Sequence, residues 1–268
     1  MIILDFDKPI IMGVINLTPD SFYHHSRSEN IDGLFTKIDS MISEGVDIID
    51  IGAESTRPGA NLITKDEEIK RLQEIIPKFK KKYDCILSLD TMKSEVARFG
   101  LDHGVDIIND VSGLTFDKSM IDVISSFKAG VILMHMKGTP KTMQEDVSYT
   151  SVVDEVFLFL KQQISLCEQK KIKSIFIDPG IGFGKDLESN LDLIRHLELF
   201  LELKKPIVIG VSRKSFIDKI SLSDVTNRLG GSIGANLVAW RNGANIFRVH
   251  DVFETKQAFD VVSALEGV

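Results

Sequence analysis

Short apolar runs and amphipathic stretches alternate along the whole chain. Eight runs of four to eight residues are dominated by Ile, Val and Leu: Pro9–Asn16, Asp47–Ile51, Ile86–Asp90, Asp106–Asn109, Gly130–His135, Ser174–Asp178, Pro206–Ile209 and Asn245–Arg248. Runs of this length without regular polar alternation are typical of strands buried on both faces, as in parallel sheets. The pattern therefore predicts eight parallel strands.

Between these runs, apolar residues recur at helical spacing, most clearly in Ile31–Glu44, Asp66–Lys82, Val152–Gln169 and Val252–Leu265. Counting every such stretch predicts eight helical segments, and eight β/α units in 268 residues match the size of a TIM (β/α)8 barrel. An open doubly wound sheet ranks second, because the first strand and its turn lack a GxGxxG fingerprint. Since no Pro/Gly/Ser-rich linker interrupts the chain, we predict one domain over residues 1–268.

The balance of charge limits the classes of partner. The chain has 32 Lys and Arg against 39 Asp and Glu, a net charge of −7, which opposes broad binding to nucleic acids or anionic membranes. Cys85 and Cys167 do not form a disulfide framework and are interpreted as thiols in a reducing compartment. The first residues carry no signal-peptide pattern, and no apolar run approaches the ~18 residues of a membrane helix. We therefore expect a cytoplasmic protein.

In a TIM barrel, functional residues lie at the carboxyl ends of the strands. Polar residues gather at that end of the predicted strands: Asn16, Asp90, Asn109, His135, Asp178, Arg248 and His250. The opposite ends carry ordinary turn residues such as Gly45 and Gly104. This asymmetry predicts a site at the carboxyl rim, with His135 placed either there or in the core.

Three cations are predicted on this rim. Arg248 and His250 are two residues apart, so a strand places both on the same side, and Arg57 lies in the loop after the second strand. A guanidinium beside an imidazole suits phosphate or diphosphate oxygens. For any single arginine, a salt bridge to a neighbouring carboxylate is the alternative, but for the three together we favour an anion site.

Asp90, Asn109 and Asp178 end three different predicted strands and admit three interpretations. They could bind a divalent metal, cap the following helices, or bind a flat heterocycle that bears amino and ring N–H donors. Capping fits Asp178 poorly, because Pro179 and Gly180 follow it. Lys214 could contact such a ring from the other side, and the glycine-rich loop around Phe183 is long enough to approach it.

Six motifs, in order, resemble those of dihydropteroate synthases. They are MGVINLTPDSF from Met12, DIGAESTRPG from Asp50, MHMKGTP from Met134, DPGIGFGK from Asp178, GVSRKS from Gly210 and RVHDV from Arg248. Members of this family are TIM barrels of the folate pathway. They join 4-aminobenzoate, which sulfonamide drugs mimic, to the diphosphate ester of 6-hydroxymethyl-7,8-dihydropterin, use Mg2+ and are usually homodimers.

The resemblance implies a role for each matching residue. The pterin would be held by Asp90, Asn109, Asp178 and Lys214, and the aminobenzoate site would be lined by Pro58, Phe183, Lys214 and Ser215. Met134 would be a further substrate-binding residue. The diphosphate would be held by Asn16, Thr56, Arg57, Arg248 and His250, with Asn16 near Mg2+. Asp178, Lys214, Arg248 and His250 would be the catalytic residues.

The sequence departs from the family pattern after Phe22, where Tyr23 to Arg27 replace the common Ser-Asp-Gly-Gly. This change leaves open a pterin-binding paralogue without turnover. A methyltetrahydrofolate-dependent methyltransferase on the same barrel is the other alternative, although it has no use for the arginine of STRPG or the RVH motif. The synthase reading is favoured over both.

Overall fold

The eight predicted strands form a parallel barrel. The computed structural model describes residues 4–17, 27–56, 59–143 and 147–267. Its strands are β1 (Ile10–Asn16), β2 (Ile48–Gly52), β3 (Ile86–Asp90), β4 (Ile107–Asp110), β5 (Gly130–Met134), β6 (Ile175–Asp178), β7 (Val208–Ile209) and β8 (Ile246–Val249). Their order is β6-β5-β4-β3-β2-β1-β8-β7, and one bridge between Ile177 and Ile207 joins β6 to the β7 segment. The predicted TIM barrel is therefore confirmed.

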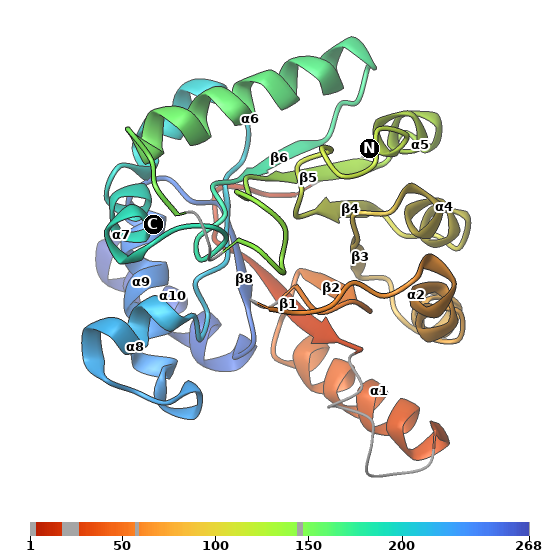
Figure 1. Ribbon diagram of the computed structural model, residues 1–268. Helices are drawn as coiled ribbons and strands as arrows, with labels where there is room; N and C mark the ends of the chain where they lie inside the picture. The colour runs from red at the N-terminus through yellow and green to blue at the C-terminus, as the bar shows by residue number, and fades with distance from the viewer. Residues whose placement is uncertain (1–3, 18–26, 57–58, 144–146, 268) are drawn as a thin grey trace.

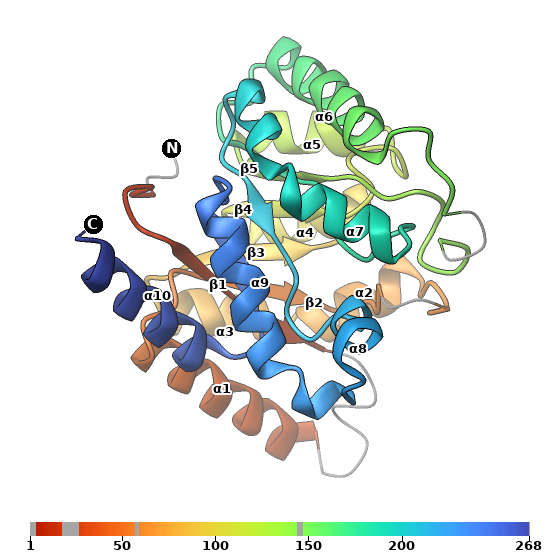
Figure 2. The ribbon, with the colours of Figure 1, turned by 90° about the vertical axis from the view of Figure 1, so that its left-hand side faces the viewer.

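Helices surround the barrel (Figures 1 and 2). Within the described ranges they are α1 (Arg27–Ser43), α2 (Lys65–Leu72), α3 (Ile75–Lys82), α4 (Ser94–Asp102), α5 (Met120–Phe127), α6 (Val152–Gln169), α7 (Leu187–Arg195), α8 (Ser215–Ser221), α9 (Leu229–Arg241) and α10 (Val252–Glu266). Short 3-10 helices occupy Leu197–Leu203 and Val225–Asn227. None of the helices in these ranges is both long and apolar enough to cross a membrane.

The single helix predicted over Asp66–Lys82 is wrong, because α2 ends at Leu72 and α3 begins at Ile75. Pro77 accounts for the break. It lacks the N–H that a continuous helix would donate to the carbonyl of Gln73, and its ring crowds that carbonyl. The prediction of eight helical segments was also too low. The segment between β2 and β3 contains α2 and α3, and the segment between β7 and β8 contains α8 and α9.

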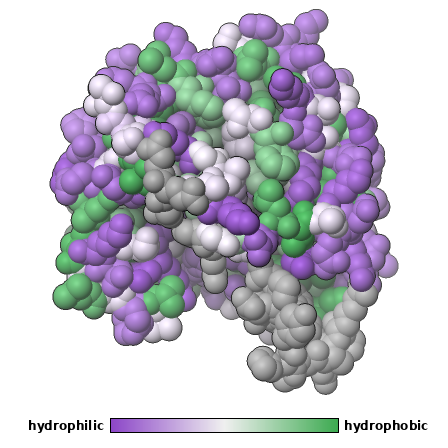
Figure 3. All heavy atoms as spheres, in the orientation of Figure 1, coloured by the Kyte–Doolittle hydropathy of each residue, from purple (hydrophilic) through white to green (hydrophobic). Residues whose placement is uncertain are grey.

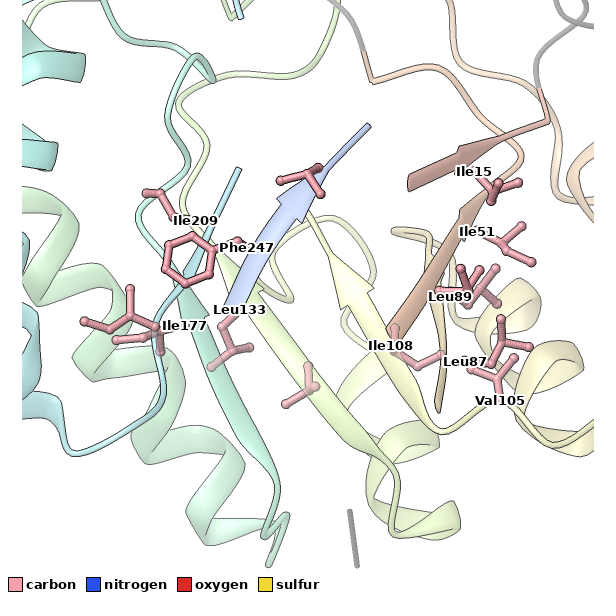
Figure 4. Close-up of a cluster of buried hydrophobic side chains, with 14 of the residues drawn as sticks. Ile15, Ile51, Leu87, Leu89, Val105, Ile108, Leu133, Ile177, Ile209 and Phe247 are labelled. Carbon is pink, nitrogen blue, oxygen red and sulfur yellow. The ribbon is translucent and has the colours of Figure 1, made fainter. Parts of the chain in front are cut away.

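Side chains that point outward from the strands pack against the helices. Figure 4 shows part of this layer, which includes Ile15, Ile51, Leu89, Ile108, Leu133, Ile177, Ile209 and Phe247. All of these side chains are almost completely buried. Period-2 alternation therefore directs the intervening residues of each strand into the barrel.

The inward-facing residues change character along the barrel axis. Near the amino ends of the strands they form an apolar plug of Ile10, Met12, Ile48, Ile107, Ile132, Phe176, Val208 and Ile246. Toward the carboxyl ends, the inward positions include Asp50, Asp90, Asn109, Asp178 and Arg248. The barrel interior is therefore apolar near the amino ends of the strands and polar near their carboxyl ends. The face seen in Figure 3, which has the orientation of Figure 1, is mostly hydrophilic, with scattered apolar side chains.

Candidate active site

Arg248 lies at the centre of the polar layer. Its Nε donates to Asp50 Oδ2 at 2.7 Å and its Nη2 to Asp90 Oδ2 at 2.9 Å. The Asn109 amide donates to the same Asp50 oxygen at 3.2 Å. One guanidinium therefore links carboxylates from two neighbouring strands, and Asp50 also fixes the amide on a third.

This layer is buried, and burial sets its electrostatics. Asp50 is 0 % exposed and Asp90 6 % exposed. Burial raises the pKa of Asp90, although the Arg248 guanidinium acts in the opposite direction. Burial alone would lower the pKa of Arg248, but the carboxylates of Asp50 and Asp90 outweigh it and raise that pKa. Because Arg248 is the cation bonded to both carboxylates, removing it would leave two buried acids side by side.

Asp178 and Lys214 form the other side of the layer. Asp178 Oδ1 accepts from the backbone N–H of Gly180 at 2.7 Å. Lys214 Nζ donates to the carbonyl oxygen of Ile181 and lies 4.7 Å from the centre of the Phe183 ring. Burial lowers the pKa of Lys214 to about 8, against the opposing effect of Asp178. The glycine-rich loop after β6 thus brings an aromatic ring, a half-buried cation and a buried carboxyl group together.

His250 follows β8 on the side of the barrel that carries Arg248. Its Nδ1 lies 3.1 Å from the hydroxyl of Ser212, which also accepts from the His250 backbone N–H at 3.3 Å. Beside it, Arg213 Nε donates to Asp251 at 2.9 Å. Burial, with Arg248 and Arg213 nearby, lowers the pKa of His250 to about 4. His250 is therefore a neutral imidazole at pH 7 in the ligand-free protein.

The lowered pKa of His250 predicts how its imidazole titrates and how stability depends on pH. We expect its Cε1–H NMR signal to show no titration above pH 5, and addition of diphosphate to raise its pKa by one unit or more. Because the folded pKa lies below the unfolded value, stability falls as pH drops from about 6.5 toward 4. A His250→Gln spectrum would assign the signal. An ordinary titration near 6.5 without ligand would show that the imidazole is not desolvated.

The described residues offer few direct metal ligands. They contain no group of three or more His, Cys, Asp or Glu side chains that could hold a metal ion. Asn16, half-buried at the carboxyl end of β1, provides a carboxamide oxygen. Mg2+ is typically bound by one or two protein oxygens together with substrate phosphates. The residues therefore fit a magnesium ion that arrives with a phosphorylated ligand rather than one held in a closed protein cage.

Comparisons with known proteins agree with this geometry. The family model described as "Pterin binding enzyme" matches residues 12–250. The dihydropteroate synthase of Escherichia coli K12 is 38% identical over 263 residues, which cover 97% of this chain and 93% of the relative. The chain belongs to the dihydropteroate synthase family.

Solved structures of dihydropteroate synthases superpose closely. The enzyme from Clostridium difficile, crystallised in the presence of pteroic acid, has a TM-score of 0.91 and 38% identity, with 96% and 97% of the two chains covered. The Xanthomonas albilineans enzyme with 4-aminobenzoic acid has a TM-score of 0.91 and 36% identity, with 99% of this chain and 96% of that chain covered. The predicted resemblance is thereby confirmed over nearly the whole chain.

Most residues that the resemblance to dihydropteroate synthases singled out lie at the carboxyl rim. Asp90, Asn109, Asp178, Lys214 and Arg248 belong to the polar layer. The others described here are Asn16 at the end of β1, Thr56 after β2, Met134 at the end of β5, Phe183 in the loop after β6, Ser215 at the start of α8 and His250 after β8. Arg57 and Pro58 lie outside the described residues. So do Tyr23 to Ser26, where the sequence departs from the family pattern. The roles assigned to all of these residues stay predictions.

Two predicted alternatives are settled by geometry. Asp90 and Asn109 do not cap helices: Asp90 pairs with Arg248, Asn109 donates to Asp50, and α4 begins after Lys93 with Asp117 accepting from Ser94 N–H. His135 is buried, with an exposed fraction of 8 %. The salt-bridge alternative for Arg248 holds in this state, which leaves its role toward a diphosphate as a prediction.

Three sets of buried or half-buried charged groups were not predicted from the sequence. Asp50 stands between Ile49 and Ile51 in a strand, and a lone carboxylate in such a run was the available signal. Lys93 bonds Glu54 and Glu68, each at 2.8 Å, and Glu54 also accepts from Ile63 N–H at 2.7 Å. This triad fixes the two ends of the loop that carries Thr56. The third group is Lys185, which is buried behind the glycine-rich loop.

Proposed function

We propose that the polar layer binds the diphosphate ester of 6-hydroxymethyl-7,8-dihydropterin and that the protein condenses it with 4-aminobenzoate. The products are 7,8-dihydropteroate and diphosphate, as in the dihydropteroate synthase family. One observation supports this most strongly: three carboxyl groups, an amide and two cations, from five strands and the residue before α8, line the barrel interior above an apolar plug. Such a chamber suits a flat heterocycle with donors along one edge and acceptors along the other.

The pterin would be recognised by complementary hydrogen bonds. Asp178 would accept from the amino group and ring N–H of the aminopyrimidinone edge, which present two parallel donors. Asn109 would pair with neighbouring ring nitrogens, because its side chain both donates and accepts. Lys214 would donate to a ring carbonyl or ring nitrogen from the side of α8. Asp90 and Met134 complete the pterin site, and Arg248 lies next to it through its bond to Asp90.

Bond breaking would precede attack by the amine. The bond between the exocyclic methylene and the diphosphate oxygen breaks, and its electron pair leaves with diphosphate. The positive charge on the methylene spreads into the pterin ring, where the buried Asp178 carboxylate stabilises it. The 4-aminobenzoate nitrogen then donates its lone pair to the methylene and loses a proton to solvent or to the released diphosphate. No covalent enzyme intermediate is required.

The anion would be stabilised by groups at the rim. Asn16, Thr56, Arg57, Arg248 and His250 are proposed to bind diphosphate oxygens, with Asn16 also near Mg2+. Bound Mg2+ would neutralise negative charge on the leaving group. Phe183, Ser215 and Pro58, with Lys214, are proposed to line the 4-aminobenzoate site. From the family resemblance we also propose that the protein is a homodimer in the cytoplasm. A molar mass of one protomer, measured by analytical ultracentrifugation, would exclude the dimer.

Product formation tests this proposal. Purified protein given both substrates and Mg2+ should form dihydropteroate, and chelation by EDTA should abolish the activity until Mg2+ is restored. Matched reactions would omit one substrate or replace the pterin diphosphate with methyltetrahydrofolate. Pterin binding without product would favour a non-catalytic paralogue, and transfer of the methyl group from methyltetrahydrofolate to an added methyl acceptor would favour the methyltransferase.

A further inference from the structure

A buried lysine with an unusual set of partners follows the glycine-rich loop. Lys185 is 2 % exposed, and its Nζ lies near four acceptors. These are the carbonyl oxygens of Gly180 at 2.9 Å, Phe183 at 3.0 Å and His135 at 3.2 Å, and the Nδ1 of His135 at 3.0 Å. Within the described residues, the hydrogen bonds of this ammonium therefore go to backbone oxygens and an imidazole rather than to a carboxylate.

These bonds join two loops that come from neighbouring strands. Gly180 and Phe183 belong to the loop after β6, whereas His135 directly follows β5. The contact between the loops is close: a Cβ at Gly180 would lie 1.9 Å from the His135 carbonyl oxygen, and the backbone there has a φ of +73°. Glycine is therefore required at this position, and the Lys185 ammonium lies where the carbonyl groups of both loops converge.

The clamped loop contacts the active site through three of its residues. The Gly180 N–H donates to Asp178, the Ile181 carbonyl accepts from Lys214, and the Phe183 ring lies beneath the Lys214 ammonium. Lys185 bonds the carbonyl oxygens of Gly180 and Phe183, which flank Ile181 on either side. A change in the course of this loop would move the Phe183 ring and the carbonyl that holds Lys214.

Burying an ammonium is costly, so its presence needs a compensating interaction. Burial lowers the pKa of Lys185 to about 7, and the negative charge of Asp178 opposes this shift. Burial, together with the Lys185 charge, lowers the pKa of His135 to about 3, so the imidazole is neutral and can accept at Nδ1. The neutral state of His135 thus agrees with its role as the acceptor from Lys185.

We infer that Lys185 is a positioning residue, which holds the Gly180–Gly184 loop so that Phe183 and Lys214 form the 4-aminobenzoate half of the site. This inference rests on the proposed function. Lys185 acts through the loop and is not expected to touch either substrate. Loss of the Lys185 side chain should therefore weaken binding of 4-aminobenzoate more than binding of the pterin. Apart from Lys214, the proposed pterin contacts come from β3, β4 and the end of β6, which the loop does not form.

The test is the steady-state kinetics of Lys185→Met, which keeps the length of the side chain but removes its donors. We expect the KM for 4-aminobenzoate to rise about tenfold or more, with kcat falling less than threefold. The Kd of 6-hydroxymethylpterin should change less than threefold. Lys80→Met is the matched control: it removes the 3.0 Å ion pair with Asp106 at the other end of the barrel and should leave all three constants unchanged.

A second pair of variants keeps the test decisive if Lys185→Met does not fold. His135→Asn retains an acceptor close to the position of Nδ1 and should behave like the wild type. His135→Leu removes that acceptor and should raise the KM for 4-aminobenzoate about threefold. Absence of dihydropteroate formation by the wild type would refute the proposed function. An active wild type with unchanged KM values in Lys185→Met, or in His135→Leu should the former not fold, would overturn the positioning role alone.

Discussion

Replacing Asp178 with asparagine is expected to raise the Kd of 6-hydroxymethylpterin by roughly a hundredfold. The substitution removes a buried carboxylate and places an amide donor where the aminopyrimidinone edge also donates. Loss of a charge-assisted bond, with a buried donor left unpaired, costs about 3 kcal/mol, which corresponds to this change in affinity. Isothermal calorimetry at pH 7.5 would measure it.

Asp186→Asn is the matched control for this substitution. Asp186 is exposed and caps α7 by accepting from Ser189 N–H at 2.9 Å, so its replacement alters one carboxylate nearby in sequence but outside the polar layer. We expect its pterin affinity to equal that of the wild type. Equal affinities for all three proteins would remove Asp178 from the pterin site.

Replacing Arg248 with methionine is expected to reduce the free energy of unfolding by about 3–5 kcal/mol. The substitution removes the cation that pairs with Asp50 and Asp90, and leaving a buried charge without its partner has a cost of this size. Denaturant unfolding would measure the loss. Arg195→Met, which removes the exposed contacts with Glu188 and Asp192, should change stability by less than about 1 kcal/mol.

The stability deficit of Arg248→Met should also depend on pH. Without the guanidinium, the pKa of Asp90 should rise further above its unfolded value, because burial already raises it in the wild type. A carboxyl group with a raised folded pKa loses stability as pH rises, so the deficit should be larger at pH 8 than at pH 5. A deficit that shrinks with rising pH would show that the two carboxylates do not depend on Arg248.

Arg248 and His250 should also act together on the leaving group. If both stabilise the same diphosphate, losses in kcat/KM for Arg248→Met and His250→Ala should be less than additive in the double variant.

The barrel and the rim could be predicted because they depend on local patterns. Isoleucine- and valine-rich runs mark the strands. Six of the eight runs end in a polar residue, and these residues fall at the carboxyl rim because parallel strands share their direction. Asp90, Asn109 and Asp178 were found this way. The break between α2 and α3 was missed because the apolar spacing continues through Pro77, where only the absent backbone N–H interrupts the helix.

The partners within the site could not be predicted from the sequence. Arg248 and Asp50 are 198 positions apart and meet only because β8 and β2 flank β1 in the closed barrel. Lys185 follows Gly184 in a motif that resembles an ordinary turn, and nothing local indicates that its side chain folds back into the protein. Its burial depends on the contact between the loops after β5 and β6, which is a property of the tertiary structure.

Asp178 is proposed to recognise the amino-bearing edge of the pterin inside the barrel, and the proposed function depends most directly on this contact. The most direct test is the affinity of the wild type and Asp178→Asn for 6-hydroxymethylpterin and for the analogue that lacks the 2-amino group. We predict that the wild type prefers the amino compound by roughly a hundredfold, and that Asp178→Asn loses most of this preference. The same preference in both proteins would contradict the account, because the amino group would then be recognised elsewhere.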